Sequence, residues 1–152
     1  MFAALPRLLE RAGMRERGSI TAIHTVLVAG GDLDEPVADE VRGLLDGHVV
    51  LDRRVAERGR FPAIDPLASL SRLMRAVADE EHRAAAARLR ALLAALERHR
   101  DLLAVGAYRS GGDPETDAAL ERLPAIEAFL AQRADEAAPF AETVARLREA
   151  VA

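Results

Sequence analysis

Two stretches decide the fold of this chain: GSITAIHTVLV at residues 18–28 and FPAIDPLASLSRLM at residues 61–74. Residues 20–28 are rich in β-branched side chains without clean alternation, which is typical of a strand covered on both faces. Between the two stretches, the apolar spacing predicts a helix near 37–45, a second short strand at 48–51 and a short polar helix over 52–58. Strand, helix and strand with short connections indicate an α/β layer.

The character of the sequence changes near residue 76. Residues 79–105 contain no Gly or Pro, and their leucines recur at helical spacing, which predicts one long amphipathic helix. Asp113 and Pro114 suit the start of the next helix, for which we expect a kink at Pro124. A last helix begins near Pro139 and aligns Phe140 with later apolar residues. We therefore predict two domains, residues 1–76 and a helical bundle over 77–152, with a short helix over 2–12 at the start.

Composition excludes several classes of protein. The net charge of −4 does not favour a nucleic-acid partner, and no apolar run approaches the roughly 20 residues of a membrane span. Cysteine is absent, and all 21 basic residues are arginine, so the phosphate loop GxxxxGK[ST], which needs a lysine, is not in this chain. The carboxylates Asp32, Asp34 and Glu35 fit a solvated turn better than a magnesium site, and we expect no metal site. The cytosol is the default location.

Arg72 is the sharpest candidate for chemistry. It follows a proline-containing loop and the short stretch LASLS. An arginine held at such a corner can reach across a subunit boundary, where its guanidinium neutralises charge on a transferring phosphoryl group. The plainer interpretation is a structural ion pair with a carboxylate such as Asp65, and spacing alone favours it.

Phe61 and Phe140 are the two aromatic candidates. Phe61 stands in a loop before Pro62, where its ring could offer a flat face to a nucleobase. The alternative is an ordinary loop anchor packed on the core. Phe140 has the same two interpretations, and its alignment with Val144 and Leu147 favours a place in the bundle core.

A series of segments shared with a known family follows along nearly the whole chain: FAALPRLLERAG (2–13), GSITA (18–22), TVL (25–27), DEPVADEVR (34–42), LDGHVVL (45–51), FPAID (61–65), LSRLM (70–74) and VGAYRSGGDPETD (105–117). In these segments the chain resembles the type III secretion and flagellar export ATPases. A more distant relative is the catalytic subunit of rotary ATP synthases. The resemblance implies an α/β fold, namely the C-terminal half of a RecA-like P-loop NTPase domain with part of its parallel sheet, followed by an α-helical bundle.

The resemblance also implies roles for the candidate residues. Arg72 matches the arginine finger that reaches the nucleotide of a neighbouring subunit, Phe61 the position that stacks on adenine, and Phe140 a second aromatic that closes the adenine pocket. The implied cofactor is ATP, with Mg²⁺ held by residues outside this chain. The sequence departs from the family at AGGD (29–32), where EGDD is usual, and at Arg60, where histidine is usual.

The family implies ATP hydrolysis by a homohexamer that drives release of substrates from chaperones and protein export. Its implied partners are a central stalk protein and export chaperone–substrate complexes, in the cytoplasm and peripheral to the inner-membrane export apparatus. The phosphate loop, catalytic glutamate and Mg²⁺-side aspartate are not among these residues, so we expect the chain to be inactive by itself. It could be an expressed fragment, a mis-started gene model or one product of a split gene. The alternative is a non-enzymatic module that docks chaperones or substrates, or caps a hexamer.

Overall fold

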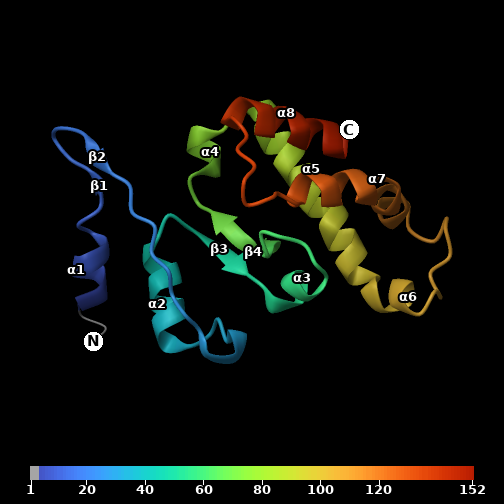
Figure 1. Ribbon diagram of the computed structural model, residues 1–152, viewed down its shortest axis with the longest axis horizontal. Helices are drawn as coiled ribbons and strands as arrows, with labels where there is room; N and C mark the ends of the chain where they lie inside the picture. Colours follow the sequence, from blue (N-terminus) through green and yellow to red (C-terminus); the bar gives the residue numbers. More distant parts are fainter. Residues whose placement is uncertain (1–3) are drawn as a thin grey trace. The chain divides into compact units, whose positions relative to one another are not determined.

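The computed structural model describes residues 4–152, and the chain divides into two compact units, Met1–His48 and Val49–Ala152. Figure 1 shows the helices and strands along the chain. Among the described residues, no helix has the length and apolar character needed to cross a lipid bilayer. The boundary predicted at residues 76/77 stays a prediction, since this division follows compactness and lies at 48/49 instead.

The first unit contains short elements. Helix α1 (Leu5–Leu9) precedes the two-residue strands β1 (Gly13–Met14) and β2 (Ser19–Ile20), which pair antiparallel. A 3-10 turn, η2 (Ala29–Gly31), leads to helix α2 (Pro36–Leu44), which confirms the helix predicted near 37–45. Part of the helix predicted over 2–12 falls on Phe2 and Ala3, outside the described residues.

The strand predicted over residues 20–28 was wrong in extent. Strand β2 ends at Ile20, and residues 21–28 have no regular structure. The side chains of Ile23 and Leu27 are 93% and 90% exposed, and His24, expected to be buried, is exposed as well. A strand needs a neighbour for its backbone N–H and C=O groups, and within residues 4–152 only two-residue β1 pairs with β2.

A small α/β part begins at the boundary of the two units, which falls within strand β3 (Gly47–Leu51). Strand β3 and helix α3 (Arg53–Glu57) confirm the predicted order, and the Asp52 carboxylate caps α3 by accepting the Arg54 N–H at 2.7 Å. Strand β4 (Ile64–Ser71) pairs with β3 and occupies a stretch that the sequence had indicated as a loop. The short helix α4 (Met74–Val77) follows.

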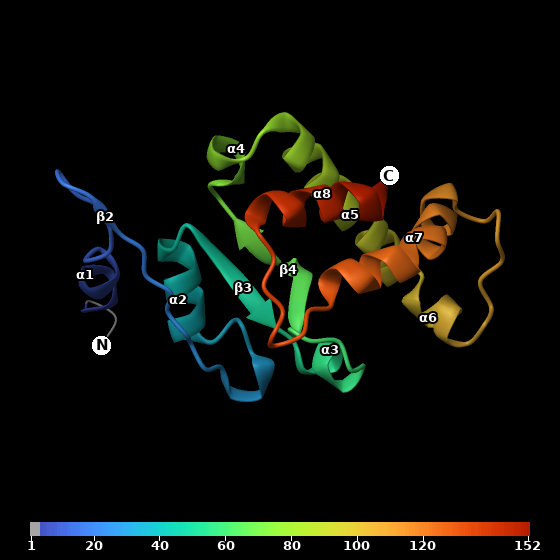
Figure 2. The same cartoon turned by 45° about the horizontal axis from the view of Figure 1, so that its top comes forward.

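Helices α5 (Glu80–Arg98), α7 (Pro114–Leu130) and α8 (Phe140–Val151) pack on one another as the predicted bundle (Figures 1 and 2). Its core contains Leu92, Ala95, Ala119 and Ile126, all fully buried. The helix predicted over 79–105 is interrupted at His99, where α5 ends and the five-residue α6 (Arg100–Ala104) begins. Pro124 lies inside α7.

Candidate functional site

Arg72 lies directly after the end of β4 and before α4, and its side chain is exposed. The Asp65 carboxylate, on the same strand, is bonded to the backbone. Its Oδ1 accepts the N–H groups of Leu67 at 2.8 Å and Ala68 at 3.1 Å. The candidate arginine therefore lies at the surface, directly after a strand whose first half is organised by the Asp65 carboxylate.

The turn around Asp65 is joined to strand β3 by Ser69. The Ser69 hydroxyl donates to the Asp65 carbonyl at 2.6 Å and accepts the Val50 N–H at 3.0 Å. Pro66 has no N–H to give to a sheet ladder, so side chains take over part of the hydrogen bonding here. The hydrogen bonds within residues 65–69 (DPLAS) thus fix the backbone conformation that leads to Arg72.

Arg90 on α5 also binds the backbone of residues 66–69, and no sequence pattern had indicated this contact. Its Nη1 donates to the carbonyls of Pro66 and Ser69, the latter at 3.2 Å, and its Nη2 donates to the carbonyl of Leu67 at 3.0 Å. One guanidinium from the bundle therefore bonds three backbone carbonyls of β4. Arg90 is more than 20 residues from these acceptors in the sequence, which explains why spacing could not reveal the contact.

Phe61 is 58% exposed, so more than half of its surface is accessible in this chain. Its backbone is attached to the bundle, because the Phe61 carbonyl accepts the N–H of Gln132, just beyond α7, at 2.8 Å. Arg60, only 14% exposed, donates to the Ile64 carbonyl at 3.1 Å and pairs with Glu127 of α7 at 3.4 Å. The aromatic ring is thus presented outward from a loop tied to the bundle.

Phe140, at the first position of α8, is 74% exposed, which corrects the interpretation that placed it in the bundle core. Leu147, two turns later, is buried, so the apolar face turns inward only after the first turn of the helix. The Phe140 ring meets the His82 imidazole edge-on, with ring centroids 5.8 Å apart. Both aromatic candidates therefore present exposed ring surface.

A small pocket lies between the residues that follow these two aromatics. It has a volume of about 240 Å³, below the roughly 300–1,000 Å³ of typical ligand sites. Pro62 and Ile64 form one side and Leu130, Thr143 and Arg146 belong to the other, whereas the rings of the two aromatic candidates do not line it. The pocket shows that the loop after Phe61 and the first turns of α8 border the same region.

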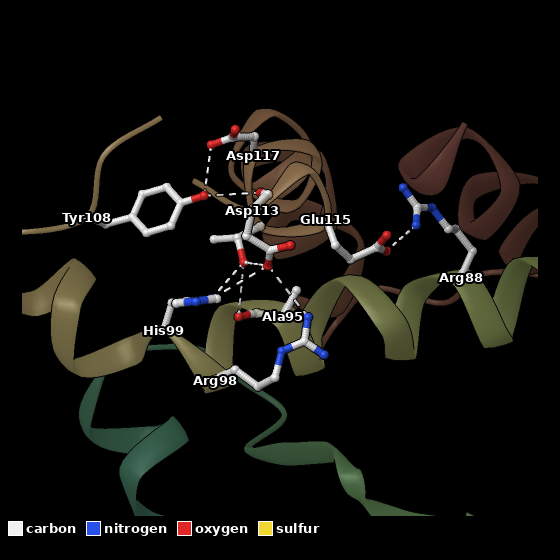
Figure 3. Close-up of polar contacts among 9 residues, drawn as sticks. Arg88, Ala95, Arg98, His99, Tyr108, Asp113, Glu115 and Asp117 are labelled. Atoms are coloured by element: carbon white, nitrogen blue, oxygen red, sulfur yellow. Dashed lines mark hydrogen bonds and ion pairs between the residues drawn. The ribbon is translucent and has the colours of Figure 1, made fainter. Parts of the chain in front are cut away.

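A polar cluster joins α5 to the start of α7 (Figure 3). The fully buried Thr116 donates its hydroxyl proton to Asp113 at 2.6 Å, and His99 Nδ1 lies 2.8 Å from the same hydroxyl oxygen. The same hydroxyl lies 3.4 Å from the Ala95 carbonyl, so the carboxylate at 2.6 Å is the better acceptor for its single proton. With the proton on that bond, His99 Nδ1 is the donor to the hydroxyl oxygen. The hydrogen bond from Thr116 lowers the pKa of Asp113, and the nearby Arg98 at 3.6 Å adds to the effect.

The loop before α7 is fixed by Tyr108. Its hydroxyl donates to Asp117 at 2.9 Å, while Asp117 also accepts the Gly111 N–H at 2.7 Å. Desolvation raises the pKa of Tyr108, and the bond to Asp117 raises it further. Arg88 pairs with Glu115 beside the cluster (Figure 3). The spacing DPET had predicted Asp113 at the helix start, but it did not reveal that Thr116 and His99 complete the network.

Within residues 4–152, no group of three or more His, Asp or Glu side chains is arranged to hold a metal ion. Asp32 uses its Oδ1 to accept the Asp34 N–H at 3.0 Å, as in the turn expected there. The acidic residues near 32–35 therefore shape the chain before α2.

Comparison with known proteins identifies the family. Residues 78–149 match the family model of the type III secretion EscN ATPase C-terminal domain, and residues 1–71 match that of the ATP synthase alpha/beta nucleotide-binding domain. The chain is 57% identical over 136 residues to the SPI-2 type 3 secretion system ATPase of Salmonella typhimurium, covering 90% of this chain and 31% of that protein. It is 51% identical to the flagellum-specific ATP synthase of Pseudomonas aeruginosa, covering 100% and 34%.

Comparison with solved structures identifies the same family. The assembled ATPase EscN of enteropathogenic E. coli superposes with a TM-score of 0.94 at 43% identity, covering 99% of this chain and 37% of that one. EscN in complex with its central stalk EscO gives a TM-score of 0.88, covering 99% and 36%. The chain belongs to the family of type III secretion and flagellar export ATPases, and it spans about a third of the length of the curated relatives it matches.

Proposed function

We propose that this chain is the C-terminal part of a hexameric ATPase that drives type III or flagellar protein export, and that Arg72 acts on ATP bound by a neighbouring subunit. The observation that carries the proposal is the exposed Arg72 at the end of β4, after a turn held by both a carboxylate and a guanidinium. A fixed backbone before an exposed arginine suits a side chain that must reach a partner.

The chemistry follows from the charge of the guanidinium. As the γ-phosphoryl group transfers to water, negative charge on its oxygens is stabilised by a cation placed beside them. The outward rings of Phe61 and Phe140 supply apolar faces for the adenine. The phosphates and Mg²⁺ would be held by residues outside this chain, since a chain without lysine has no phosphate loop of the usual kind.

The proposed partners follow from the relatives. EscN is an assembled ATPase in one of the matching structures, and in another it is in complex with its central stalk EscO. We propose that this protein likewise assembles as a homohexamer around a stalk, in the cytoplasm and peripheral to the membrane-embedded export apparatus. Its helical bundle would receive chaperone–substrate complexes.

The test is a chimera in which residues 1–152 replace the corresponding third of the Pseudomonas flagellum-specific ATP synthase, to which the whole chain aligns. Arg72→Ala should lower ATP turnover by roughly 10³–10⁵-fold while leaving nucleotide affinity unchanged, as for other arginine fingers. Arg75→Ala, another exposed arginine three residues away, is the matched control and should keep turnover. Full turnover by the Arg72→Ala chimera would remove Arg72 from the mechanism.

A non-enzymatic docking or capping module is the second candidate, favoured by the packed bundle of α5, α7 and α8, which offers a docking surface. Purified residues 1–152 should show no ATP hydrolysis under either proposal. The chimera separates the two, because an active chimera that depends on Arg72 supports the enzyme part and a chimera that assembles but stays inactive supports the module.

A further inference from the structure

Two consecutive peptide units of β4 have both of their polar groups bonded to side chains. In the unit that joins Pro66 to Leu67, the N–H donates to Asp65 and the C=O accepts from Arg90. The next unit, from Leu67 to Ala68, repeats the arrangement with the same two side chains. Since N–H and C=O point in opposite directions across a planar peptide, the carboxylate and the guanidinium lie on opposite sides of the backbone.

This arrangement departs from a regular strand. Successive carbonyls of a strand alternate in direction, whereas the carbonyls of Pro66 and Leu67 both reach Arg90. In these two peptide units the direction of the backbone is therefore set in part by the side chains that bind it. The negative Asp65 faces the N–H ends and the positive Arg90 faces the C=O ends, so both charges favour the observed orientation of the peptide dipoles.

The Arg90 guanidinium is chemically suited to bind several backbone carbonyls at once. Its donors are arranged in a rigid planar fork, and three carbonyls within four residues of β4 accept from it. The last of these, Ser69, is three residues before Arg72. Arg90 belongs to α5, whose other face carries the fully buried Leu92 and Ala95 of the bundle core. The bundle is thereby connected to the strand end that presents Arg72.

We propose that Arg90 is a positioning residue for Arg72. By binding the carbonyls of Pro66, Leu67 and Ser69, it fixes the direction in which the end of β4 presents Arg72 to the neighbouring subunit. The inference rests on the proposed function of Arg72. The Arg90 contact also links α5 to β4, since movement of the bundle would shift the end of the strand through it.

The first experiment uses the 152-residue chain. Arg90→Ala removes the donors to the Pro66 and Leu67 carbonyls but leaves the bonds from the Leu67 and Ala68 N–H groups to Asp65. Since Arg90 holds these peptide units in place, its loss should let the two amides open more often and exchange about tenfold faster, the scale of one lost hydrogen bond to a charged group. Arg90→Lys should give an intermediate rate, because lysine offers a point charge without the planar fork. Arg100→Ala, which removes the ion pairs with Glu97 and Asp101 on the same bundle, is the matched control and should leave these amides unchanged. If exchange at Leu67 and Ala68 is unchanged in Arg90→Ala, Arg90 does not hold β4 in place.

The second experiment measures ATP hydrolysis by the chimera described above. Arg90→Ala should lower kcat by roughly 10–100-fold, the scale of a misplacement of about 1 Å, with KM for ATP changed less than about threefold. Arg90→Lys should recover part of the loss. A purely structural role would instead lower the yield of folded hexamer while each folded hexamer kept the parental kcat.

The outcomes separate the two proposals. If Arg72→Ala abolishes turnover while Arg90→Ala keeps the parental kcat, the positioning role is wrong and the proposed function stands. If Arg72→Ala keeps full turnover, the proposed function fails and the positioning role fails with it. If both variants lose turnover, and Arg90→Ala does so through kcat, both proposals are supported.

Discussion

Residues 21–28 and residues 85–95 are both rich in apolar side chains, yet they have opposite environments. In the first stretch Ile23 and Leu27 are almost fully exposed and no regular structure forms. In the second, helix α5 buries Leu89, Leu92 and Ala95 against α7 and α8. The difference shows that apolar content alone does not bury a segment: a helix satisfies its own backbone, whereas a strand requires a neighbour.

The largest expected effect compares the same substitution in the two stretches. Leu92→Ala should lower the free energy of unfolding by about 2–5 kcal/mol, because it removes a fully buried side chain and leaves a cavity. Leu27→Ala, at a side chain that is 90% exposed, should change it by less than about 0.5 kcal/mol. Urea unfolding followed by circular dichroism measures both. Equal losses would show that residues 21–28 are packed in solution.

A second prediction concerns the polar part of the bundle. Thr116→Val keeps the shape of the side chain but removes the hydroxyl that serves both Asp113 and His99, and it should destabilise the chain by about 1–3 kcal/mol. Thr143→Val is the matched control, since the Thr143 hydroxyl bonds to the Pro139 carbonyl near the surface; its effect should stay within about 0.5 kcal/mol. Thermal unfolding compares the two, and equal melting temperatures would deny the cluster a stabilising role.

The smallest effect is a pH dependence. Because the pKa of Asp113 is lowered in the folded chain, its contribution to stability is present above the unfolded value near 4 and is lost as the pH falls through the folded pKa. Unfolding free energies measured at pH 6 and pH 3 should therefore fall more in the parent chain than in Asp113→Asn. The same fall in both proteins would show that Asp113 does not couple folding to protons.

The local elements were predictable where one stretch of sequence specifies them. The helix over 36–44, strand β3, helix α3 and the start of α8 followed from spacing and turn residues. The extent of β4 was missed because Pro66 and the turn around Asp65 suggested a loop. The break at His99 was missed because no glycine or proline marks it.

The candidate site likewise contains residues that the sequence predicted and contacts that it did not. Arg72, Phe61 and Phe140 were named from sequence, and the structure places all three at the surface. The contacts of Arg60 and Arg90 were not predicted, because their acceptors lie on other elements and no spacing rule joins Arg90 to the carbonyls of β4.

The sequence by itself determined the helical bundle, the small α/β part and the absence of a lysine-containing phosphate loop, because periodicity, capping residues and composition are local properties. Only the tertiary structure decided which side chains orient the strand before Arg72, which aromatics face outward, and that Thr116, Asp113 and His99 meet in one cluster. These depend on contacts between residues far apart in the chain, which form only when helices pack and bring backbone carbonyls and charged groups within hydrogen-bonding distance.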